Sequence, residues 1–262
     1  MSEQNNQIRK INDFQQQMYE DWEKVTANSL VNQYSILLET FKEKEVIKIL
    51  DIGGASGYFA SALVNFFSEK ACEIFVVDST KYSTWEDFNS RITFIEDSVE
   101  NLDKYFSENM FDLIFANRVF HHFVDKTWKK SIKSINDSMA QISRVLKNEG
   151  CFCITDYFYD GYIFNSSTSK IIYGLTSCKN PLLVSVFRKI DSKSAGIGVC
   201  FLSRKMWLDL FSKNDLTIEQ LHEGHQIKHA LFRRMMYKIG LLMKNGQEDA
   251  IMILKKKTLS IK

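Results

Sequence analysis

Short apolar runs that alternate with amphipathic stretches constrain this chain more than any other feature of its sequence. Helical patterns near 57–69, 100–107 and 127–147 separate the first five of these runs. Strands that alternate with helices need crossover connections, which give a parallel sheet covered by helices on both faces. The sequence therefore predicts an α/β fold with a doubly wound, mostly parallel sheet of seven strands. The expected strands are 46–52, 72–77, 92–95, 111–116, 151–155, 216–221 and 249–254.

The regions around this core are expected to form a cap and an insertion. Residues 1–45 are predicted to form an N-terminal helical cap in front of a domain at 46–262. Apolar residues recur there at helical spacing, at Leu30, Tyr34, Leu37, Leu38 and Phe41. Residues 157–200 are rich in aromatic residues and serine, and we expect a lid-like insertion of helices and loops.

Lys147 to Gly150 is interpreted as the basic last turn and glycine stop of the long helix. Residues 204–213 form an amphipathic pattern that predicts a helix.

Composition excludes several classes of protein. With 45% apolar residues in 262, the chain can bury a large core without disulfides or a metal. A net charge of +2 gives no overall attraction to nucleic acid. The polar start and the odd number of cysteines, five, predict reduced thiols in the cytoplasm. No stretch approaches the roughly 18 apolar residues of a membrane span, so no membrane partner is expected.

One strand–loop–helix segment carries the strongest functional signal. A buried strand ends at Asp51, and a glycine-rich loop, residues 53–57, leads into the next helix. Glycine allows backbone to turn sharply and to approach a ligand. The following helix is expected to offer free N–H groups to a ligand carboxylate or phosphate. The segment fails the Gly-x-Gly-x-x-Gly dinucleotide fingerprint, because Ala55 and Tyr58 occupy two of its glycine positions, and it lacks the phosphate loop. An ordinary strand–helix turn remains the alternative.

The order acidic-x-Gly-x-Gly-x-Gly, with Ala55 in the middle glycine position, resembles motif I of the class I S-adenosylmethionine-dependent methyltransferases. A carboxylate two residues before the first glycine suits a cofactor with an ammonium and a sulfonium group, and it would repel a pyrophosphate. The resemblance implies that this segment binds the methionine part of S-adenosylmethionine through Asp51, Gly53, Gly54, Ala55 and Gly57.

Later strands continue the resemblance in the same order. Asp78 ends an apolar strand 21 residues after Gly57 and is expected to accept hydrogen bonds from ribose hydroxyls, with Ser79 beside it. In the resembling family, an acidic–polar pair after the third strand meets the adenine amino group, which implies this role for Asp97 and Ser98. Asp97 is equally suited to cap a helix that begins near Val99.

The segment after the fourth strand is expected to face the methyl acceptor. The strand 111–117 resembles motif IV, and its last residue, Asn117, would lie at the edge nearest the substrate. His121 and His122 follow, as in many small-molecule members of the family, whereas the Asn/Asp-Pro-Pro-Tyr/Phe tetrad of enzymes that methylate amino groups of nucleic acids is missing. A histidine can take a proton from the acceptor near physiological pH. His121 and His122 are therefore the candidate catalytic residues, with His122 slightly favoured, and a packing role is the alternative for each.

Two further clusters have weaker interpretations. His222, His225 and His229 have a spacing that could bind a metal, but no cysteine or carboxylate completes the set, and no metal is predicted. Residues 226–245 carry five basic side chains and no acid, which is typical of an amphipathic helix with a solvated face. The same segment could recognise an acidic substrate or a phosphate backbone. Its basic residues are Lys228, Arg233, Arg234, Lys238 and Lys244.

The sequence thus predicts a methyltransferase that acts on an O, N or C nucleophile of a small molecule, acidic or aromatic. Nucleic acid is not the expected partner, and a homo-oligomer is left open. Two alternatives remain. One is an RNA or protein methyltransferase that uses the basic segment 226–245, and the other is a non-catalytic relative that only binds S-adenosylmethionine.

Overall fold

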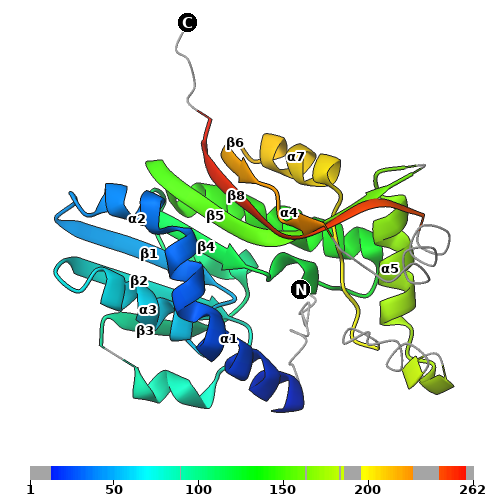
Figure 1. The fold of residues 1–262 in the computed structure, drawn as a ribbon, viewed down its shortest axis with the longest axis horizontal. Coiled ribbons are helices and arrows are strands. Elements are labelled where there is room, and N and C mark those ends of the chain that lie inside the picture. Colours follow the sequence, from blue (N-terminus) through cyan, green and yellow to red (C-terminus); the bar gives the residue numbers. More distant parts are fainter. Residues whose placement is uncertain are drawn as a thin grey trace, which may run out of the picture. The chain divides into compact units, whose positions relative to one another are not determined.

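The structure is a computed structural model that describes residues 13–88, 90–162, 164–182, 184–185, 196–226 and 242–257 (Figure 1). The chain divides into two compact units. Unit 1 comprises Met1–Ala116 and Arg144–Phe152, and unit 2 comprises Asn117–Ser143 and Cys153–Lys262. The boundary predicted at residue 45 stays a prediction. None of the described helices is both long and apolar enough to cross a membrane.

Unit 1 contains the parallel part of the sheet. Its strand order is β3-β2-β1-β4-β5, in which β1 is parallel to β2 and β4, and β2 is parallel to β3. The elements are α1 (Asp13–Gln33), α2 (Ser35–Phe41), β1 (Val46–Ile52), α3 (Tyr58–Phe66), β2 (Ala71–Asp78), η1 (Ser83–Asp87), β3 (Ile92–Glu96), η2 (Val99–Lys104), β4 (Phe111–Asn117) and the first residues of β5 (Leu146–Gly161).

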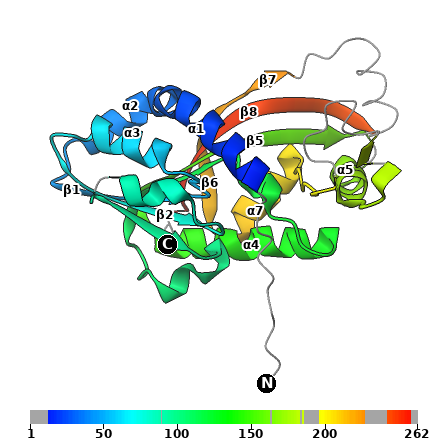
Figure 2. The same ribbon diagram turned by 90° about the horizontal axis from the view of Figure 1, so that it is seen from below.

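The parallel strands are buried because helices cover them. In β1, the side chains of Ile47, Ile49 and Leu50 are fully buried, as expected for a strand with both faces covered. Helices α1, α2 and α3 lie together on one side of these strands (Figure 2). Phe115 of β4 meets Tyr34 and Phe59 edge-on, at ring-centroid distances of 5.1 and 5.2 Å. Since parallel strands end at the same edge, the loops that follow β1, β2 and β3 come together.

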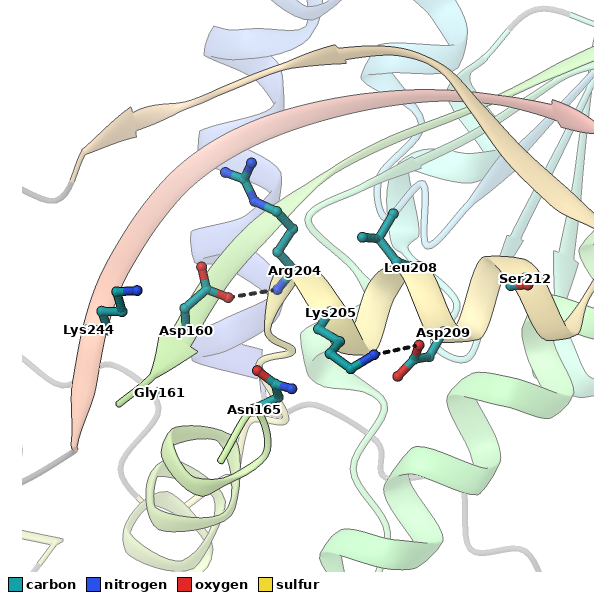
Figure 3. A pocket seen from close by; sticks show the side chains of 9 residues that line it. All are labelled: Asp160, Gly161, Asn165, Arg204, Lys205, Leu208, Asp209, Ser212 and Lys244. Atoms are coloured by element: carbon teal, nitrogen blue, oxygen red, sulfur yellow. Dashed lines mark hydrogen bonds and ion pairs between the residues drawn. The ribbon is translucent and has the colours of Figure 1, made fainter. Parts of the chain in front are cut away.

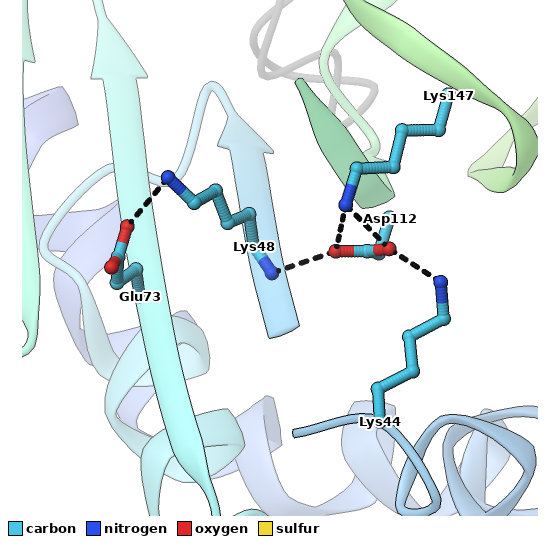
Figure 4. Close-up of polar contacts among 5 residues, drawn as sticks. All are labelled: Lys44, Lys48, Glu73, Asp112 and Lys147. Atoms are coloured by element: carbon cyan, nitrogen blue, oxygen red, sulfur yellow. Dashed lines mark hydrogen bonds and ion pairs between the residues drawn. The ribbon is translucent and has the colours of Figure 1, made fainter. Parts of the chain in front are cut away.

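A network of ion pairs around one buried carboxylate lies at the opposite edge of these strands (Figure 4). Asp112, the second residue of β4, is fully buried and accepts hydrogen bonds from the side chains of Lys44 and Lys147 at 2.6 and 2.9 Å. The backbone N–H of Lys48 donates to the same carboxylate at 3.0 Å. Burial alone would raise the pKa of Asp112, but these donors together hold it below its ordinary value. The network joins β1, β4 and β5 within unit 1.

Unit 2 contains the antiparallel part of the sheet, where β8 pairs antiparallel with β6 and β7. The strand order there is β5-β8-β6, and β7 also pairs with β8. Its elements are η3 (Phe120–His122), most of α4 (Trp128–Val145), the rest of β5, α5 (Ser167–Ser177), α7 (Arg204–Lys213), β6 (Leu216–His222), β7 (His225–Gln226) and β8 (Met243–Lys256).

The predicted α/β fold with a mostly parallel central sheet is confirmed, with differences in detail. The described residues form eight strands and not seven, because the short strand β7 adds to β8. The predicted helix at 100–107 is a 3-10 helix at Val99–Lys104. The predicted insertion begins later than expected, because β5 continues through residues 157–161. Most of the segment 226–245 lies outside the described residues, and its last three residues begin β8.

The interpretation of Lys147–Gly150 as the end of a helix is wrong. These residues belong to β5, which begins at Leu146 directly after α4. Lys147 is held by the carboxylate of Asp112 in β4. A Cβ atom on Gly150 would lie only 3.0 Å from the carbonyl oxygens of Phe111 and Asp112. Glycine therefore serves close packing of strands here, and not helix termination.

Candidate functional site

The loop between β1 and α3 is built from backbone conformations that favour glycine. Gly53 and Gly57 have φ angles of +63° and +90°, and Ala55 has +41° although it carries a Cβ atom. The N–H of Gly53 donates to the carbonyl of Val77 in β2 at 2.8 Å, which anchors the start of the loop. Gly57 then directly precedes α3 as its N-cap residue. The predicted glycine-rich turn is thus present, with a left-handed strain at Ala55.

Asp51 lies under this loop with an unused oxygen. Its side chain is 1% exposed, and Oδ2 has no hydrogen-bond partner among the described residues. A Cβ atom on Gly54 would lie 2.3 Å from this oxygen, so glycine is required at that position. Burial raises the pKa of Asp51 well above its ordinary value, and the nearby charges of Glu23 and Asp78 raise it further. Asp51 and Gly54 together form a tight cradle beneath the loop.

Asp78, at the carboxyl end of β2, joins the loop to the neighbouring strand. Its Oδ2 accepts a hydrogen bond from the N–H of Ala55 at 3.1 Å, and its Oδ1 accepts one from Thr80 at 2.9 Å. Burial raises the pKa of Asp78 to about 6, although these N–H groups and that of Ser79 oppose the shift. Asp78 and Ser79 remain partly exposed. The carboxylate therefore keeps acceptor capacity for a ligand beside the glycine-rich loop.

Asp97 and Ser98 follow β3 and are engaged mainly in local contacts. Asp97 Oδ1 accepts hydrogen bonds from the Ser98 N–H and the Asn101 side chain, and its Oδ2 accepts one from the Tyr105 hydroxyl, each at 2.7 Å. Burial would raise the pKa of Asp97, but these donors and the charge of Lys104 hold it below its ordinary value. The N-cap residue of η2 is Ser98 and not Asp97. One acceptor position of Asp97 is left, so an adenine contact stays a prediction.

Aromatic residues that the sequence analysis did not single out support the loop from the other side. Trp85 in η1 donates its indole N–H to the Ala55 carbonyl at 2.7 Å, and Thr84 donates to the Ser56 carbonyl at 2.9 Å. Trp85 stacks on Phe94 of β3 at a centroid distance of 4.8 Å. A Cβ atom on Gly57 would lie 2.7 Å from the Phe94 ring. Aromatic side chains near 82–94 were the available signal, but their register was not readable.

The expectation of free N–H groups at the start of α3 is wrong at Phe59, and the N–H of Ser56 in the preceding loop is also occupied. Glu23 of α1 accepts hydrogen bonds from the N–H groups of Ser56 and Phe59 at 3.0 and 2.9 Å. A further contact joins the same carboxylate to the Ser56 hydroxyl. A signal was present, because position 23 lies on the same helical stripe as the buried Ala27 and Leu30. An acid on an apolar stripe needs a partner.

The chain after β4 belongs to unit 2 and forms a second group of candidate residues. Asn117 is the half-buried last residue of β4, and Arg118 follows with a φ of +55°. His121 is 8% exposed, and its Nδ1 lies 2.8 Å from Oδ1 of Asp156 in β5. The His121 carbonyl accepts a hydrogen bond from Cys200 at 2.8 Å. A carboxylate on Nδ1 fixes the ring and its tautomer, which leaves Nε2 as the basic nitrogen.

Asp156 was not among the predicted site residues. The available signal was its place directly after the predicted strand 151–155. Its Oδ1 also accepts a hydrogen bond from the N–H of Tyr157 at 2.8 Å, and its Oδ2 has no partner among the described residues. A fully buried carboxylate with this arrangement is available to balance a charge on the His121 ring.

The second histidine differs from the first in its surroundings. The side chain of His122 is exposed, and its ring centroid lies 4.1 Å from that of His121. The dense protein around it lowers the pKa of His122 well below its ordinary value, and the nearby His121 lowers it further. His122 therefore holds a proton less readily than a free histidine.

Half-buried aromatic rings surround His121 in the same unit. Phe201 stacks on the His121 ring at a centroid distance of 5.0 Å, and Tyr157 meets it edge-on at 5.1 Å. The ring centroid of Tyr159 lies 4.6 Å from that of Phe201. Burial raises the pKa of Tyr157 to about 12, so its hydroxyl stays protonated and can donate a hydrogen bond. We refer to Tyr157, Tyr159 and Phe201 as the aromatic cluster.

Unit 2 also contains an open polar cavity of about 620 Å³ (Figure 3). Arg204, Lys205 and Lys244 contribute cations to its lining, and Asp160 and Asp209 contribute carboxylates. The backbone N–H of Arg204 donates to the Asp160 side chain at 2.9 Å, and Lys205 pairs with Asp209 at 3.3 Å. No predicted cofactor-binding or catalytic residue lines this cavity, but Lys244 of the predicted basic segment does. The Arg204 guanidinium pairs with Glu223 at 2.6 Å, and the mixture of cations and carboxylates in the lining gives no preference for a ligand.

His222, His225 and His229 are the three histidines whose spacing could bind a metal. His222 ends β6 and His225 begins β7, whereas His229 lies outside the described residues. The described part of the chain contains no group of three or more metal-ligating side chains. Cys151 and Cys153 are buried in β5, and neither forms a disulfide.

Comparison with known proteins agrees with this geometry. Residues 50–154 match the family model of a methyltransferase domain. No curated protein matches the chain by sequence. The solved structure of the YcgJ protein from Bacillus subtilis is 17% identical, with a TM-score of 0.54 over 87% of this chain and 99% of that chain.

Two other solved structures are similar. An arsenic (III) S-adenosylmethionine methyltransferase from Chlamydomonas reinhardtii is 18% identical, with a TM-score of 0.53 over 82% of this chain and 64% of that chain. A 1,6-didemethyltoxoflavin-N1-methyltransferase from Burkholderia thailandensis, with bound 1,6-didemethyltoxoflavin and S-adenosylhomocysteine, is 14% identical. Its TM-score is 0.50 over 90% of this chain and 78% of that chain. At these identities, the likeness establishes the fold.

Proposed function

We propose that this chain is a class I S-adenosylmethionine-dependent methyltransferase that transfers a methyl group to a nucleophilic O, N or C atom of a small molecule. The hydrogen bond from the Ala55 N–H to the Asp78 carboxylate carries the proposal. It joins the Asp78 carboxylate, which we assign to the ribose hydroxyls, to the loop that we assign to the amino-acid end of the cofactor. When bound, S-adenosylmethionine supplies an electrophilic methyl group on a sulfonium.

The residues of unit 1 fit this cofactor. Asp51 has a buried oxygen without a partner among the described residues, and Gly54 leaves no side chain above it. The raised pKa values of Asp51 and Asp78 mean that ionisation of these carboxyl groups is unfavourable in the free protein. A cationic ligand nearby offsets this cost. We assign the methionine part to Asp51, Gly53, Gly54, Ala55 and Gly57, the ribose to Asp78 with Ser79, and the adenine edge to Asp97 and Ser98.

On the acceptor side, we assign the proton-accepting role to His121. Asp156 holds Nδ1 of His121 at 2.8 Å, which leaves Nε2 to take a proton from the attacking atom of the acceptor. The buried Asp156 carboxylate then stabilises the imidazolium that forms. The sequence analysis slightly favoured His122, but the carboxylate on His121 favours His121. We place Asn117 at the edge of the site nearest the acceptor.

The aromatic cluster supports a small acceptor with an apolar or aromatic surface. Tyr157, Tyr159 and Phe201 are half-buried and can stack on a planar molecule. Two of the similar structures carry names that specify small acceptors, arsenic(III) and 1,6-didemethyltoxoflavin. The five cysteines form no disulfide, which supports a reducing compartment, for which we propose the cytoplasm.

Calorimetry with S-adenosylmethionine and S-adenosylhomocysteine tests the proposal. We expect the parent protein to bind both, and Asp78→Ala to lose binding while its circular dichroism spectrum stays native. Asp103→Ala, at an exposed acid in η2, is a matched control that should bind normally. Absence of binding by the parent protein, or unchanged binding by Asp78→Ala, would overturn the assignment of the cofactor site.

The alternatives are tested with the same protein. An RNA methyltransferase would bind RNA in a salt-dependent way that is lost when Arg233 and Arg234 are neutralised. A non-catalytic relative would bind the cofactor but transfer no labelled methyl group to any compound of a broad metabolite extract. We expect transfer to a small molecule and no salt-dependent RNA binding.

A further inference from the structure

Glu23 is an acidic residue of α1 that contacts the cofactor loop from outside the sequence motif. Its side chain is 5% exposed. The carboxylate accepts hydrogen bonds from the N–H groups of Ser56 and Phe59 at 3.0 and 2.9 Å and contacts the Ser56 hydroxyl. Glu23 is separated from these residues by 33 and 36 positions in the chain. A long-range contact therefore fixes the end of the loop and the first turn of α3.

The position of this carboxylate matters because a helix N-terminus attracts anions. The first N–H groups of a helix have no partner within the helix, and the helix dipole adds partial positive charge there. In glycine-rich loops that bind nucleotides, a ligand phosphate takes this place. In this protein, the Glu23 carboxylate takes one of these donors, the N–H of Phe59, together with the N–H of the loop residue Ser56. A ligand anion cannot use the Ser56 and Phe59 N–H groups while Glu23 is docked.

Glu23 also adds to the negative charge around the loop. Burial raises the pKa of Glu23, the hydrogen bonds from Phe59 and Ser56 oppose this, and the charge of Asp78 raises it further. Asp51 contributes the buried oxygen that has no partner among the described residues. Three carboxyl groups thus surround one loop within unit 1. Such a group disfavours an added anion and favours a cation, because each like charge in the cluster is destabilising when ionised.

We propose that Glu23 is a positioning residue of the cofactor site, through which α1 holds the glycine-rich loop closed and favours the sulfonium over the neutral thioether. The inference rests on the proposed function. The sulfonium of S-adenosylmethionine carries a positive charge that S-adenosylhomocysteine lacks, whereas the two ligands share every other group. The ratio of their dissociation constants therefore reports charge, and their common change reports loop geometry.

The test is calorimetry of both ligands with Glu23→Gln in the full chain at pH 8. The isosteric amide keeps the size of the side chain but removes its charge, and charge-assisted hydrogen bonds are roughly twice as strong as neutral ones. We expect the affinity for S-adenosylmethionine to fall about tenfold, and that for S-adenosylhomocysteine to fall clearly less. Amide hydrogen exchange at Ser56 and Phe59 should become faster, since both N–H groups lose an ionic acceptor.

A matched control exists on the same helix. Asp21 is exposed and pairs with Gln17 in its own helix, so Asp21→Asn removes the same charge two residues away without touching the loop. We expect its ligand affinities to equal those of the parent. If Glu23→Gln does not fold, Glu23→Asp retains the charge and should keep the preference for the sulfonium while weakening both ligands.

The outcomes separate the two proposals. Equal weakening of both ligands by Glu23→Gln overturns the preference for the sulfonium, and no change in either ligand overturns the whole role of Glu23. Both results leave the proposed function intact. Loss of the sulfonium preference in Glu23→Asp also overturns the role of Glu23 in that preference. A parent protein that binds neither ligand contradicts the proposed function itself.

Discussion

The carboxyl group of Asp78 should make cofactor binding depend on pH. Burial raises the pKa of Asp78 to about 6, and only the ionised carboxylate accepts hydrogen bonds from two ribose hydroxyls with full strength. With this pKa, roughly one tenth of the molecules have an ionised Asp78 at about pH 5, and nearly all have one at about pH 8. The apparent dissociation constant of S-adenosylmethionine should therefore be about tenfold higher at pH 5 than at pH 8.

The sign of this effect follows from the direction of the shift. A carboxyl group whose pKa is raised on folding favours the protonated form in the folded state. The free energy of unfolding of the free protein therefore falls as the pH rises from 3.8 to about 6. A cationic cofactor with donor hydroxyls offsets that cost, and binding must strengthen over the same range. Asp51 and Glu23, whose pKa values are also raised, act in the same direction.

Calorimetric titration from pH 5 to pH 8 at constant ionic strength measures the effect, with Asp78→Asn as the control. The amide preserves the shape of the side chain but cannot ionise, so we expect weak binding with a clearly shallower pH profile. A flat profile for the parent protein would refute the role given to Asp78. A profile in Asp78→Asn as steep as that of the parent would also refute it, because the dependence would then arise elsewhere.

Three further predictions concern stability and the acceptor side. Asp112→Ala should lower the free energy of unfolding by about 2–4 kcal/mol in urea titrations at pH 7, because two lysines and one N–H group lose a buried acceptor. Since the pKa of Asp112 is lowered on folding, the loss should disappear as the pH falls below the unfolded value of about 3.9 toward the lower folded value. Ala55→Gly should raise stability by up to about 1 kcal/mol, because it relieves a φ of +41°, and a lower melting temperature would contradict this. His121→Gln should reduce labelled methyl transfer into a metabolite extract by about 100-fold, whereas His122→Gln changes it little; the reverse order would favour His122.

The fold was readable from the sequence wherever a strand or helix is defined by its own pattern. The strand at Val46–Ile52 and the helix at Arg204–Lys213 have the predicted bounds, because each has a clear apolar pattern and distinct flanking residues. The failure at Lys147–Gly150 has the opposite cause. A glycine after a basic residue is typical of a helix end, and the strand pairing that overrides it depends on Phe111 and Asp112 in another strand.

In the candidate site too, the residues of a local motif were predicted, and the residues that act through long-range contacts were not. Loop residues 53–57, together with Asp51 and Asp78, were predicted because the chemistry sits in a short motif with fixed spacing. Asp156 could not be assigned, since its role depends on His121, which lies 35 residues earlier in the chain. No local pattern encodes such a distance. Its position after a strand was a hint, but many acids follow strands without any role in a site.

Glu23 shows how such long-range roles can be recognised. A carboxylate on the buried stripe of an amphipathic helix is costly unless hydrogen-bond donors satisfy it. Position 23 shares its stripe with Ala27 and Leu30, both buried, so the sequence already required a donor set for this acid. The first N–H groups of a helix have no partner within that helix, so they are suitable donors for such an acid. The helix that follows the glycine-rich loop offers N–H groups of this kind. An acid on the apolar face of a helix that precedes such a motif therefore predicts a contact between the two, and the physical reason is the shared need of a buried anion and an uncapped helix for each other.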